Sequence, residues 1–200
     1  MSGRAPRLRR PVDAIAIGTS AGGVEALSVL LPALKPGLAA AVMVVLHLPR
    51  ERPSLLVEIF MPRCALPVRE AQDKEPVQPG HLYFAPADYH LLVDEGPCLS
   101  LSVDEPVHFS RPSIDVLFES AADIYGERLL GIVLTGANQD GAEGLATIHR
   151  LGGITVVQEP DSAYAPLMPQ SALRCGPVDH VLPLEGIADL LRALNEGDAT

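Results

Sequence analysis

The sequence predicts an α/β domain built on a doubly wound, mostly parallel sheet, with a small antiparallel excursion at one edge. Short apolar strands alternate with amphipathic helices along most of the chain, which is the pattern of βαβ units. Several strands are apolar throughout, as expected when helices cover both faces of a parallel sheet. In the middle of the chain, three short strands follow one another without helices, which favours antiparallel hairpins.

Composition and charge restrict the class of protein. The 200 residues are 48% hydrophobic and 20% charged, which is typical of one globular domain with a single core. The net charge of −10 argues against nonspecific binding to nucleic acid. No apolar run approaches the ~18 residues of a membrane span, so we expect no membrane insertion. The cysteines are odd in number and widely spaced, which predicts reduced thiols in a cytoplasmic protein: Cys64, Cys98 and Cys175.

We expect residues 1–10 to form a disordered basic tail and residues 11–197 to form the domain. Four arginines lie within the first ten residues, and no apolar segment follows them before Pro11. This start does not match a secretory signal.

The first half of the domain begins with a strand, a glycine-rich turn and a helix. An apolar run over 12–17 predicts the strand. Apolar residues at helical spacing from Val24 to Leu34 predict the helix, and Pro32 should shorten it. A second strand, over 41–46, is apolar throughout. A helix and a short strand complete this half, over 54–60 and 66–69.

The antiparallel excursion is expected from strands over 81–84, 90–93 and 99–101. A helix then begins at Ser113, a favourable N-cap, and Asp115 in its first turn suits the helix dipole. The strand over 129–134 leads through a second glycine-rich turn into a helix. That helix should bury Leu145, Ile148 and Leu151. The last elements are a strand, a helix, a strand and a helix, over 154–157, 169–175, 180–182 and 187–194.

The turn after the first strand carries a motif of chemical interest. Residues 18–22 read Gly-Thr-Ser-Ala-Gly and match the G-x-S-x-G nucleophile elbow, where a serine occupies a strained strand-to-helix turn. A phosphate-binding turn is the competing interpretation. It is weakened because Ser20 stands where the dinucleotide fingerprint requires glycine, and because the next strand ends in His47 rather than an acidic residue. No P-loop motif occurs in the sequence.

Three residues with complementary chemistry follow the carboxyl ends of separate predicted strands: Ser20, His47 and Asp140. Ligand sites in open parallel sheets lie beyond these strand ends, so the three should share one rim. Serine needs a base to act as a nucleophile, histidine is the usual base, and a buried carboxylate orients the imidazole. The chain order Ser-His-Asp differs from the Ser-Asp-His order of α/β-hydrolases.

Each of these residues also has a purely structural interpretation. Taken alone, Ser20 is a small residue in a crowded turn, His47 is a satisfied strand-end histidine, and Asp140 caps the helix that follows it. The catalytic interpretation therefore depends on their convergence. Among the other histidines, His108 is the one we retain as a candidate for the same rim. No set of residues has metal-ligand spacing, so no metal site is expected.

Several motifs, in order and at compatible spacing, resemble the catalytic domain of the CheB-type protein-glutamate methylesterases. The resemblance runs from about Val12 to Leu194 and is carried by the following segments: Ala16–Gly23, Leu46-His47, Pro79–Pro86, Arg111–Phe118, Leu134–Gly141 and Met168–Gln170.

The resemblance implies a serine esterase that hydrolyses glutamate γ-methyl esters on chemotaxis receptors and releases methanol, and that often deamidates receptor glutamines. It implies Ser20 as nucleophile, His47 as base and Asp140 as the acidic partner. Backbone N–H groups of Ala21 and Ala137 would be the oxyanion donors. It implies no cofactor. The cytoplasmic helices of methylated chemoreceptors would be the partners, with a separate response regulator or kinase as a further candidate.

The sequence departs from the family pattern in three respects. Ala21 stands where Thr or Ser often follows the nucleophile, and Ala137 stands where Met is common. About ten residues precede the first strand, so we expect the catalytic domain without the receiver domain that typically precedes it. A non-catalytic CheB-like module that binds a receptor or signalling partner is the first alternative function, and a nucleotide-binding α/β domain is the second.

Overall fold

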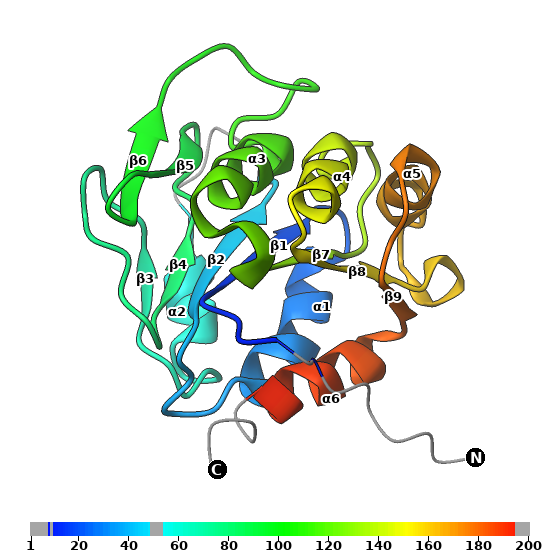
Figure 1. Cartoon of the computed structure of the whole chain (residues 1–200), viewed down its shortest axis with the longest axis horizontal. Coiled ribbons are helices and arrows are strands. Elements are labelled where there is room, and N and C mark those ends of the chain that lie inside the picture. Colours follow the sequence, from blue (N-terminus) through cyan, green and yellow to red (C-terminus); the bar gives the residue numbers. More distant parts are fainter. Residues whose placement is uncertain (1–7, 9, 49–53, 195–200) are drawn as a thin grey trace.

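The computed structural model describes residues 8, 10–48 and 54–194 (Figure 1). The expected tail, apart from Leu8 and Arg10, and the expected domain end at residue 197 lie outside the described residues. None of the helices in the described ranges is long and apolar enough to cross a membrane.

A seven-stranded sheet forms the middle layer of the domain, in the order β3-β4-β2-β1-β7-β8-β9 (Figure 1). Each neighbouring pair of strands is parallel, which confirms the predicted doubly wound class. The central strands are buried on both faces, as their continuous apolar runs require. The strands are β1 (Ala14–Thr19), β2 (Ala41–Leu46), β3 (Val68–Glu70), β4 (Leu82–Phe84), β7 (Leu129–Val133), β8 (Ile154–Gln158) and β9 (His180–Leu182).

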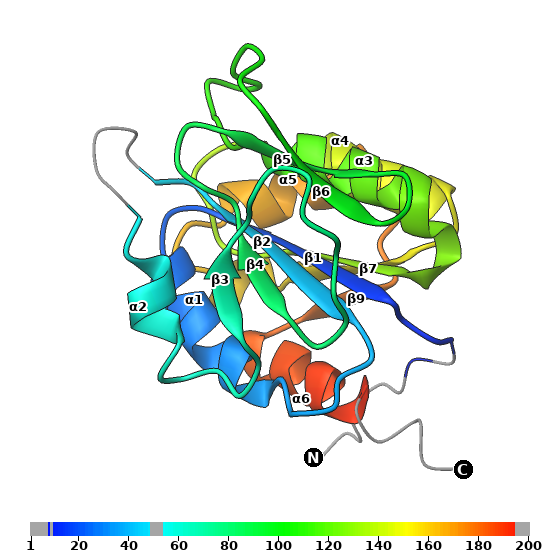
Figure 2. The same ribbon diagram turned by 90° about the vertical axis from the view of Figure 1, so that its left-hand side faces the viewer.

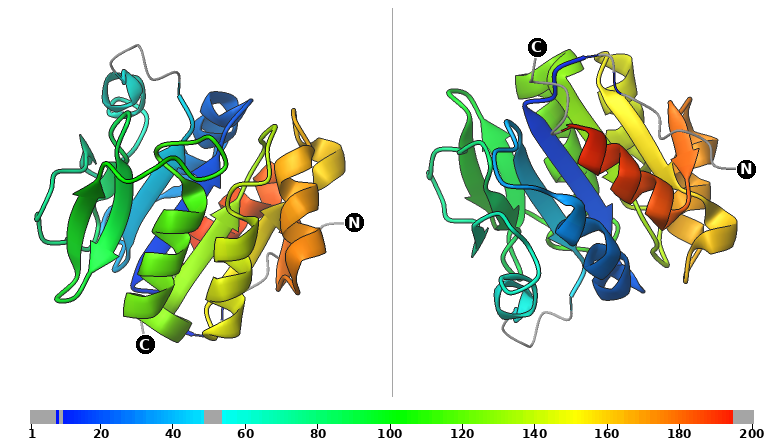
Figure 3. Two further views of the ribbon diagram at one scale, coloured as in Figure 1. Left: turned by 90° about the horizontal axis from the view of Figure 1, so that it is seen from above. Right: turned by 90° about the horizontal axis from the view of Figure 1, so that it is seen from below.

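Helices cover both faces of this sheet (Figures 1 and 3). One face packs against α3 (Ile114–Tyr125), α4 (Ala142–Arg150) and α5 (Leu167–Cys175). The other face packs against α1 (Gly23–Leu30), α2 (Leu56–Phe60) and α6 (Leu184–Leu194). The domain therefore has two hydrophobic cores separated by the sheet. Three short 3-10 turns complete the structure: η1 (Leu31–Ala33), η2 (Gly126–Arg128) and η3 (Pro160–Ser162).

The antiparallel excursion is smaller than predicted. Strands β5 (His90–Asp94) and β6 (Cys98–Ser102) form a separate two-stranded antiparallel sheet, which lies beside α3 (Figure 2). The prediction for 81–84 was wrong, because β4 runs parallel between β2 and β3 in the main sheet. All three β4 side chains are buried, and a strand buried on both faces belongs inside the sheet rather than in an exposed hairpin.

Two helix ends illustrate how local residues set the boundaries. As predicted, Pro32 ends the α1 helix early, and the chain continues as the 3-10 turn η1. The prediction that Leu151 is buried was wrong: α4 ends at Arg150, and Leu151 is 36% exposed. Leu151 is the C-cap residue, and Gly152, with φ +85°, follows it in the left-handed conformation that commonly ends a helix.

The strand order reverses between β1 and β7. The chain leaves β1 toward β2 on one side of the sheet, and it leaves β7 toward β8 on the other. Such a switch point opens a crevice at the carboxyl ends of the two strands, where α/β folds bind their ligands. The turns after β1 and β7 hold Ser20 and Asp140, so the topology brings both residues to this crevice.

Replacing Gly144 with alanine should destabilise the domain. A Cβ on Gly144 would lie 2.6 Å from Phe118 Cβ and 3.0 Å from Asp115 Cα, where α4 crosses α3. Relieving these contacts requires the two helices to separate, so we expect Gly144→Ala to lower the free energy of unfolding by about 1–3 kcal/mol in urea titrations. The matched control is Glu143→Ala, at an exposed position of the same helix. Equal stability of Gly144→Ala and wild type would contradict the close packing.

Candidate active site

Asp140 is the most completely enclosed charged residue of the candidate site. It lies in the turn between β7 and α4, and its side chain has no exposed surface. Four groups surround the carboxylate. Oδ2 accepts from His47 Nε2 at 2.8 Å and from the Ile114 N–H at 2.7 Å. Oδ1 accepts from Ser113 Oγ at 2.8 Å and from the Asp115 N–H at 3.0 Å.

These contacts correct the structural interpretation of Asp140. The helix that follows it, α4, has Gly141 as its N-cap, with no capping side chain. Asp140 instead sits at the N-terminus of α3, where unpaired N–H groups and the helix dipole favour a negative charge. Burial alone would raise the pKa of Asp140. The hydrogen bonds from His47 and from the backbone N–H groups of Asp115 and Ile114 outweigh burial and lower that pKa below its ordinary value.

Strand register places His47 and Ser20 beside each other at the same edge of the sheet. Thr19 and Leu46, the last residues of β1 and β2, are paired in the register, so Ser20 and His47 are the next residues on adjacent strands. The His47 N–H donates to the Thr19 carbonyl at 3.1 Å. The His47 side chain is 12% exposed, with Nε2 toward Asp140 and Nδ1 at 3.2 Å from Asn138 Nδ2.

The glycines of the G-x-S-x-G motif have distinct steric roles. A Cβ on Gly18 would overlap Ile114 Cγ2 at 2.2 Å, so this glycine lets the first turn of α3 approach β1. Gly22 has φ +79° and takes the left-handed conformation at the N-cap of α1. Among the described residues other than glycine, positive φ occurs at Lys74, Asp88, His108 and Phe109. Within this turn, Gly22 therefore carries the left-handed conformation, and Ser20 does not have a positive φ.

The two glycine-rich turns are held side by side. The Ser20 N–H donates to the Thr135 carbonyl at 3.0 Å, and Thr135 Oγ1 donates to the Ala21 carbonyl at 2.8 Å. Thr19 Oγ1 also donates to the Thr135 carbonyl, at 2.9 Å. Within the described residues, the N–H groups of Ala21 and Ala137 donate no hydrogen bond. Two N–H groups without a partner among the described residues thus come from neighbouring turns.

Asp115 forms a second buried acidic group behind Asp140. Its side chain is 6% exposed, and its Oδ1 accepts from the Gly144 N–H at 2.7 Å. Its Oδ2 accepts no hydrogen bond among the described residues and lies 3.5 Å from His108 Nε2. Burial, together with the charge of Asp140, raises the pKa of Asp115 to about 7 against the opposing Gly144 hydrogen bond. Sequence reasoning assigned Asp115 only to the helix dipole and missed this position.

Two other supporting residues were missed by sequence reasoning. His90 is buried on β5, where its Nδ1 accepts from the Ser113 N–H at 3.1 Å and so supports the N-cap of α3. Asn138 accepts the Asp140 N–H on its Oδ1 at 3.2 Å. The Asn-x-Asp spacing, typical of an Asx turn, was a signal that could have found Asn138. No sequence pattern pairs His90 with Ser113, because the contact joins separate elements.

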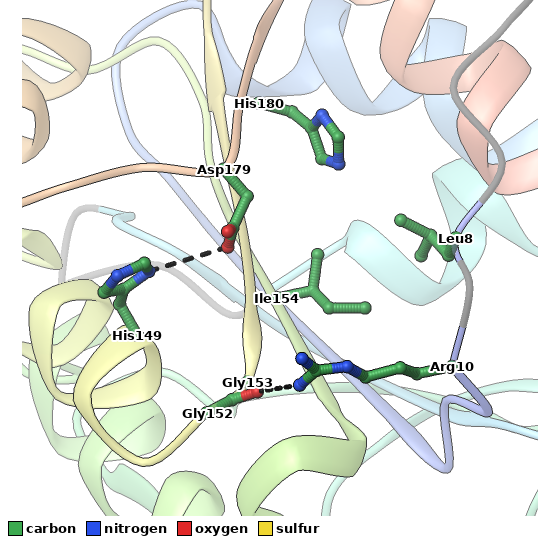
Figure 4. A pocket seen from close by; sticks show the side chains of 8 residues that line it. All are labelled: Leu8, Arg10, His149, Gly152, Gly153, Ile154, Asp179 and His180. Atoms are coloured by element: carbon green, nitrogen blue, oxygen red, sulfur yellow. Dashed lines mark hydrogen bonds and ion pairs between the residues drawn. The ribbon is translucent and has the colours of Figure 1, made fainter.

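A cavity lies at the opposite end of the sheet from Ser20, His47 and Asp140. It has a volume of about 410 Å³ and lies where β8 and β9 begin, lined by residues that include Arg10, His149, Asp179 and His180 (Figure 4). Arg10 Nη1 donates to the Gly152 carbonyl at 3.0 Å, and Asp179 accepts from the N–H and hydroxyl of Thr155. In the described part of the chain, no group of three or more His, Cys, Asp or Glu residues is arranged to hold a metal ion.

Comparisons with known proteins identify a single family. The profile of the CheB methylesterase family matches residues 15–191. A relative from Leptospira interrogans is 43% identical over 186 residues, which are 93% of this chain and 96% of the relative. The name of that relative assigns it, provisionally, as a protein-glutamate methylesterase/protein-glutamine glutaminase.

A longer relative and a solved structure agree with this match. The protein-glutamate methylesterase/protein-glutamine glutaminase of Symbiobacterium thermophilum is 38% identical over 190 residues, which are 94% of this chain and 52% of that protein. The chain thus spans about half the length of this relative. The crystal structure of the Thermotoga maritima CheB methylesterase catalytic domain superposes with a TM-score of 0.84 and 30% identity, covering 92% of this chain and all of that domain.

The raised pKa of Asp115 predicts a pH dependence of stability. Between about pH 4 and pH 7 the folded chain keeps a proton on Asp115 that the unfolded chain has lost, so stability falls as pH rises through this window. The contribution has a slope of about 1.4 kcal/mol per pH unit where one proton separates the two states. We expect Asp115→Asn, which keeps an oxygen for the Gly144 N–H, to lose this slope.

Urea unfolding at pH 5, 6 and 7 measures the difference between wild type and Asp115→Asn. Asp123→Asn, at an exposed position of the same helix, is the matched control and should follow wild type. Parallel stability curves for wild type and Asp115→Asn would contradict a protonated Asp115.

Proposed function

Because this chain belongs to the CheB methylesterase family, we propose that it hydrolyses γ-methyl esters of glutamate side chains on chemotaxis receptors and releases methanol. The observation that carries the proposal is the 2.8 Å contact between His47 Nε2 and the buried Asp140 carboxylate, beside the turn that holds Ser20. A histidine oriented by a buried carboxylate next to a serine is the arrangement that activates a hydroxyl for acyl transfer.

In the proposed mechanism, the two imidazole nitrogens have different tasks. Asp140 occupies Nε2, so in the neutral ring the proton sits on Nε2 and Nδ1 is the basic nitrogen. In the proposed reaction, Ser20 Oγ attacks the ester carbonyl carbon while its proton passes to Nδ1. Asp140 stabilises the resulting imidazolium, and the N–H groups of Ala21 and Ala137 stabilise the oxyanion.

The second half of the proposed reaction restores the enzyme. The tetrahedral intermediate collapses, the ester C–O bond breaks, and methanol leaves with the proton from His47 Nδ1. Water then gives a proton to Nδ1 and attacks the acyl-Ser20. As the bond between the acyl carbon and Ser20 Oγ breaks, Nδ1 returns the proton to Oγ, which releases the glutamate carboxyl group and regenerates the serine. The same steps with ammonia as the leaving group would deamidate glutamine, and the names of the relatives from Leptospira and Symbiobacterium include this activity.

The proposed substrate and location follow from the family. We propose methylated glutamates on the cytoplasmic helices of chemoreceptors as the substrate, and the cytoplasm as the site of reaction. A separate response regulator or kinase is the partner class we propose for control of activity. The free thiols of Cys64, Cys98 and Cys175 are compatible with a reducing compartment.

The alternative functions have less support. A non-catalytic binding module would not need Asp140 to keep a buried charge in contact with His47, and family membership points to an esterase. A nucleotide-binding domain would need a glycine in place of Ser20 in the dinucleotide fingerprint.

Ser20→Ala should abolish methanol release from a carboxyl-methylated chemoreceptor, because no other group in the proposed mechanism can form the acyl intermediate. The assay compares methanol release and melting temperature for wild type and the variant. Ser28→Ala is a matched control, since the Ser28 hydroxyl donates within α1 to the Val24 carbonyl. Wild-type rates in Ser20→Ala would remove Ser20 from the mechanism.

Asp140→Asn should lower the turnover number by about 10⁴, because an amide that donates to Nε2 favours the wrong imidazole tautomer. Steady-state methanol release measures the effect, and circular dichroism reports whether the fold is retained. A turnover number within tenfold of wild type would show that Asp140 is not the partner of the base.

A further inference from the structure

We propose that Asn138 is a positioning residue that keeps Nδ1 of His47 unprotonated in the resting site. The inference builds on the proposed role of His47 as base. The Asn138 amide group makes two contacts. Its Oδ1 accepts the Asp140 N–H at 3.2 Å, and its Nδ2 lies 3.2 Å from His47 Nδ1.

The hydrogen bond from the Asp140 N–H fixes the orientation of the Asn138 amide. If the Asn138 amide were reversed, its NH₂ would meet the Asp140 N–H, and donor would face donor. The observed orientation satisfies the Asp140 N–H and presents Nδ2 to the imidazole. Because Nδ2 can only donate, His47 Nδ1 must accept, so it carries no proton. The proton of the neutral ring is then on Nε2, where Asp140 accepts it.

The contact with Asn138 also bears on the charge of the His47 imidazole. Nε2 already donates to the buried Asp140 carboxylate at 2.8 Å, so an imidazolium would also carry a proton on Nδ1 and could not accept the serine proton. Among the described residues, Asp140 is the charged group in contact with this ring, and Asp115 lies behind it. The amide donor of Asn138 opposes the imidazolium, because protonated Nδ1 would face an N–H group. Asn138 therefore disfavours a proton on Nδ1 in the resting site.

During the reaction, His47 Nδ1 must become free to accept the proton of Ser20. A proton arriving from Ser20 must displace the Asn138 contact from Nδ1. The Asn138 amide nitrogen also lies 3.5 Å from Ser110 Oγ, which offers a second acceptor. Asn138 can thus release Nδ1 during acyl transfer while its Oδ1 still holds the Asp140 N–H.

The decisive variant is Asn138→Asp. The carboxylate has the shape of the amide and keeps an oxygen for the Asp140 N–H, but it presents an acceptor to Nδ1. We expect the acidic limb of the pH profile of kcat/KM for methanol release to move up by about 1–3 pH units. Asn138→Ala removes the donor without adding a charge and should give a smaller upward shift.

A readout independent of turnover separates this proposal from the proposed function. Nitrogen-15 NMR of histidine-labelled protein, with His47→Gln to assign the signal, follows protonation of the His47 ring directly. We expect the ring of Asn138→Asp to take up its second proton at higher pH than the wild-type ring, even if no receptor substrate is hydrolysed. Coincident His47 titrations in wild type and Asn138→Asp would overturn the proposal. A fall in kcat for Asn138→Ala without any shift of the acidic limb would also overturn it, since it would mark a purely structural turn.

Discussion

A carboxylate removed from water must find hydrogen-bond donors or lose its charge, and Asp140 is completely buried. The first turn of α3 supplies three donors, from Ser113, Ile114 and Asp115, and His47 supplies the fourth. The turn after β7, the start of α3 and the end of β2 are therefore fixed relative to one another by one side chain. Movement of any of them would remove at least one donor from a buried charge, which costs more than the loss of an ordinary hydrogen bond.

Asp115 and Asp140 lie near the same helix end, yet their environments push their pKa values apart. Asp140 receives two backbone N–H groups, a hydroxyl and the imidazole, and its pKa is lowered. Asp115 receives one N–H, from Gly144, and burial beside the charge of Asp140 raises its pKa to about 7. Keeping one member of a close carboxyl pair neutral removes the repulsion that two charges would create. Asp115 can thus tie α3 to α4 through the Gly144 N–H, while Asp140 holds the base, His47.

The proposed nucleophile is supported by a different kind of interaction. Ser20 is held by backbone and threonine contacts between two turns rather than by a charge. Thr135 bonds to both the Ala21 carbonyl and the Ala165 N–H, so a third segment of chain is fixed to the same point. Rigid turns of this kind place N–H groups before the reaction begins, and preorganised donors of this kind are the main source of oxyanion stabilisation.

The class of fold could be predicted from the amino-acid sequence, because the spacing of apolar residues indicates which faces of a strand or helix are buried. The sequence also indicated Ser20, His47 and Asp140, since residues that follow parallel strands reach one edge of the sheet. The tertiary structure decided which helix Asp140 serves, which nitrogen of His47 it meets, and the place of β4 within the main sheet. It alone revealed the contacts of Asn138, Asp115 and His90. These depend on distances between elements far apart in the chain, and local sequence patterns carry no information about such distances.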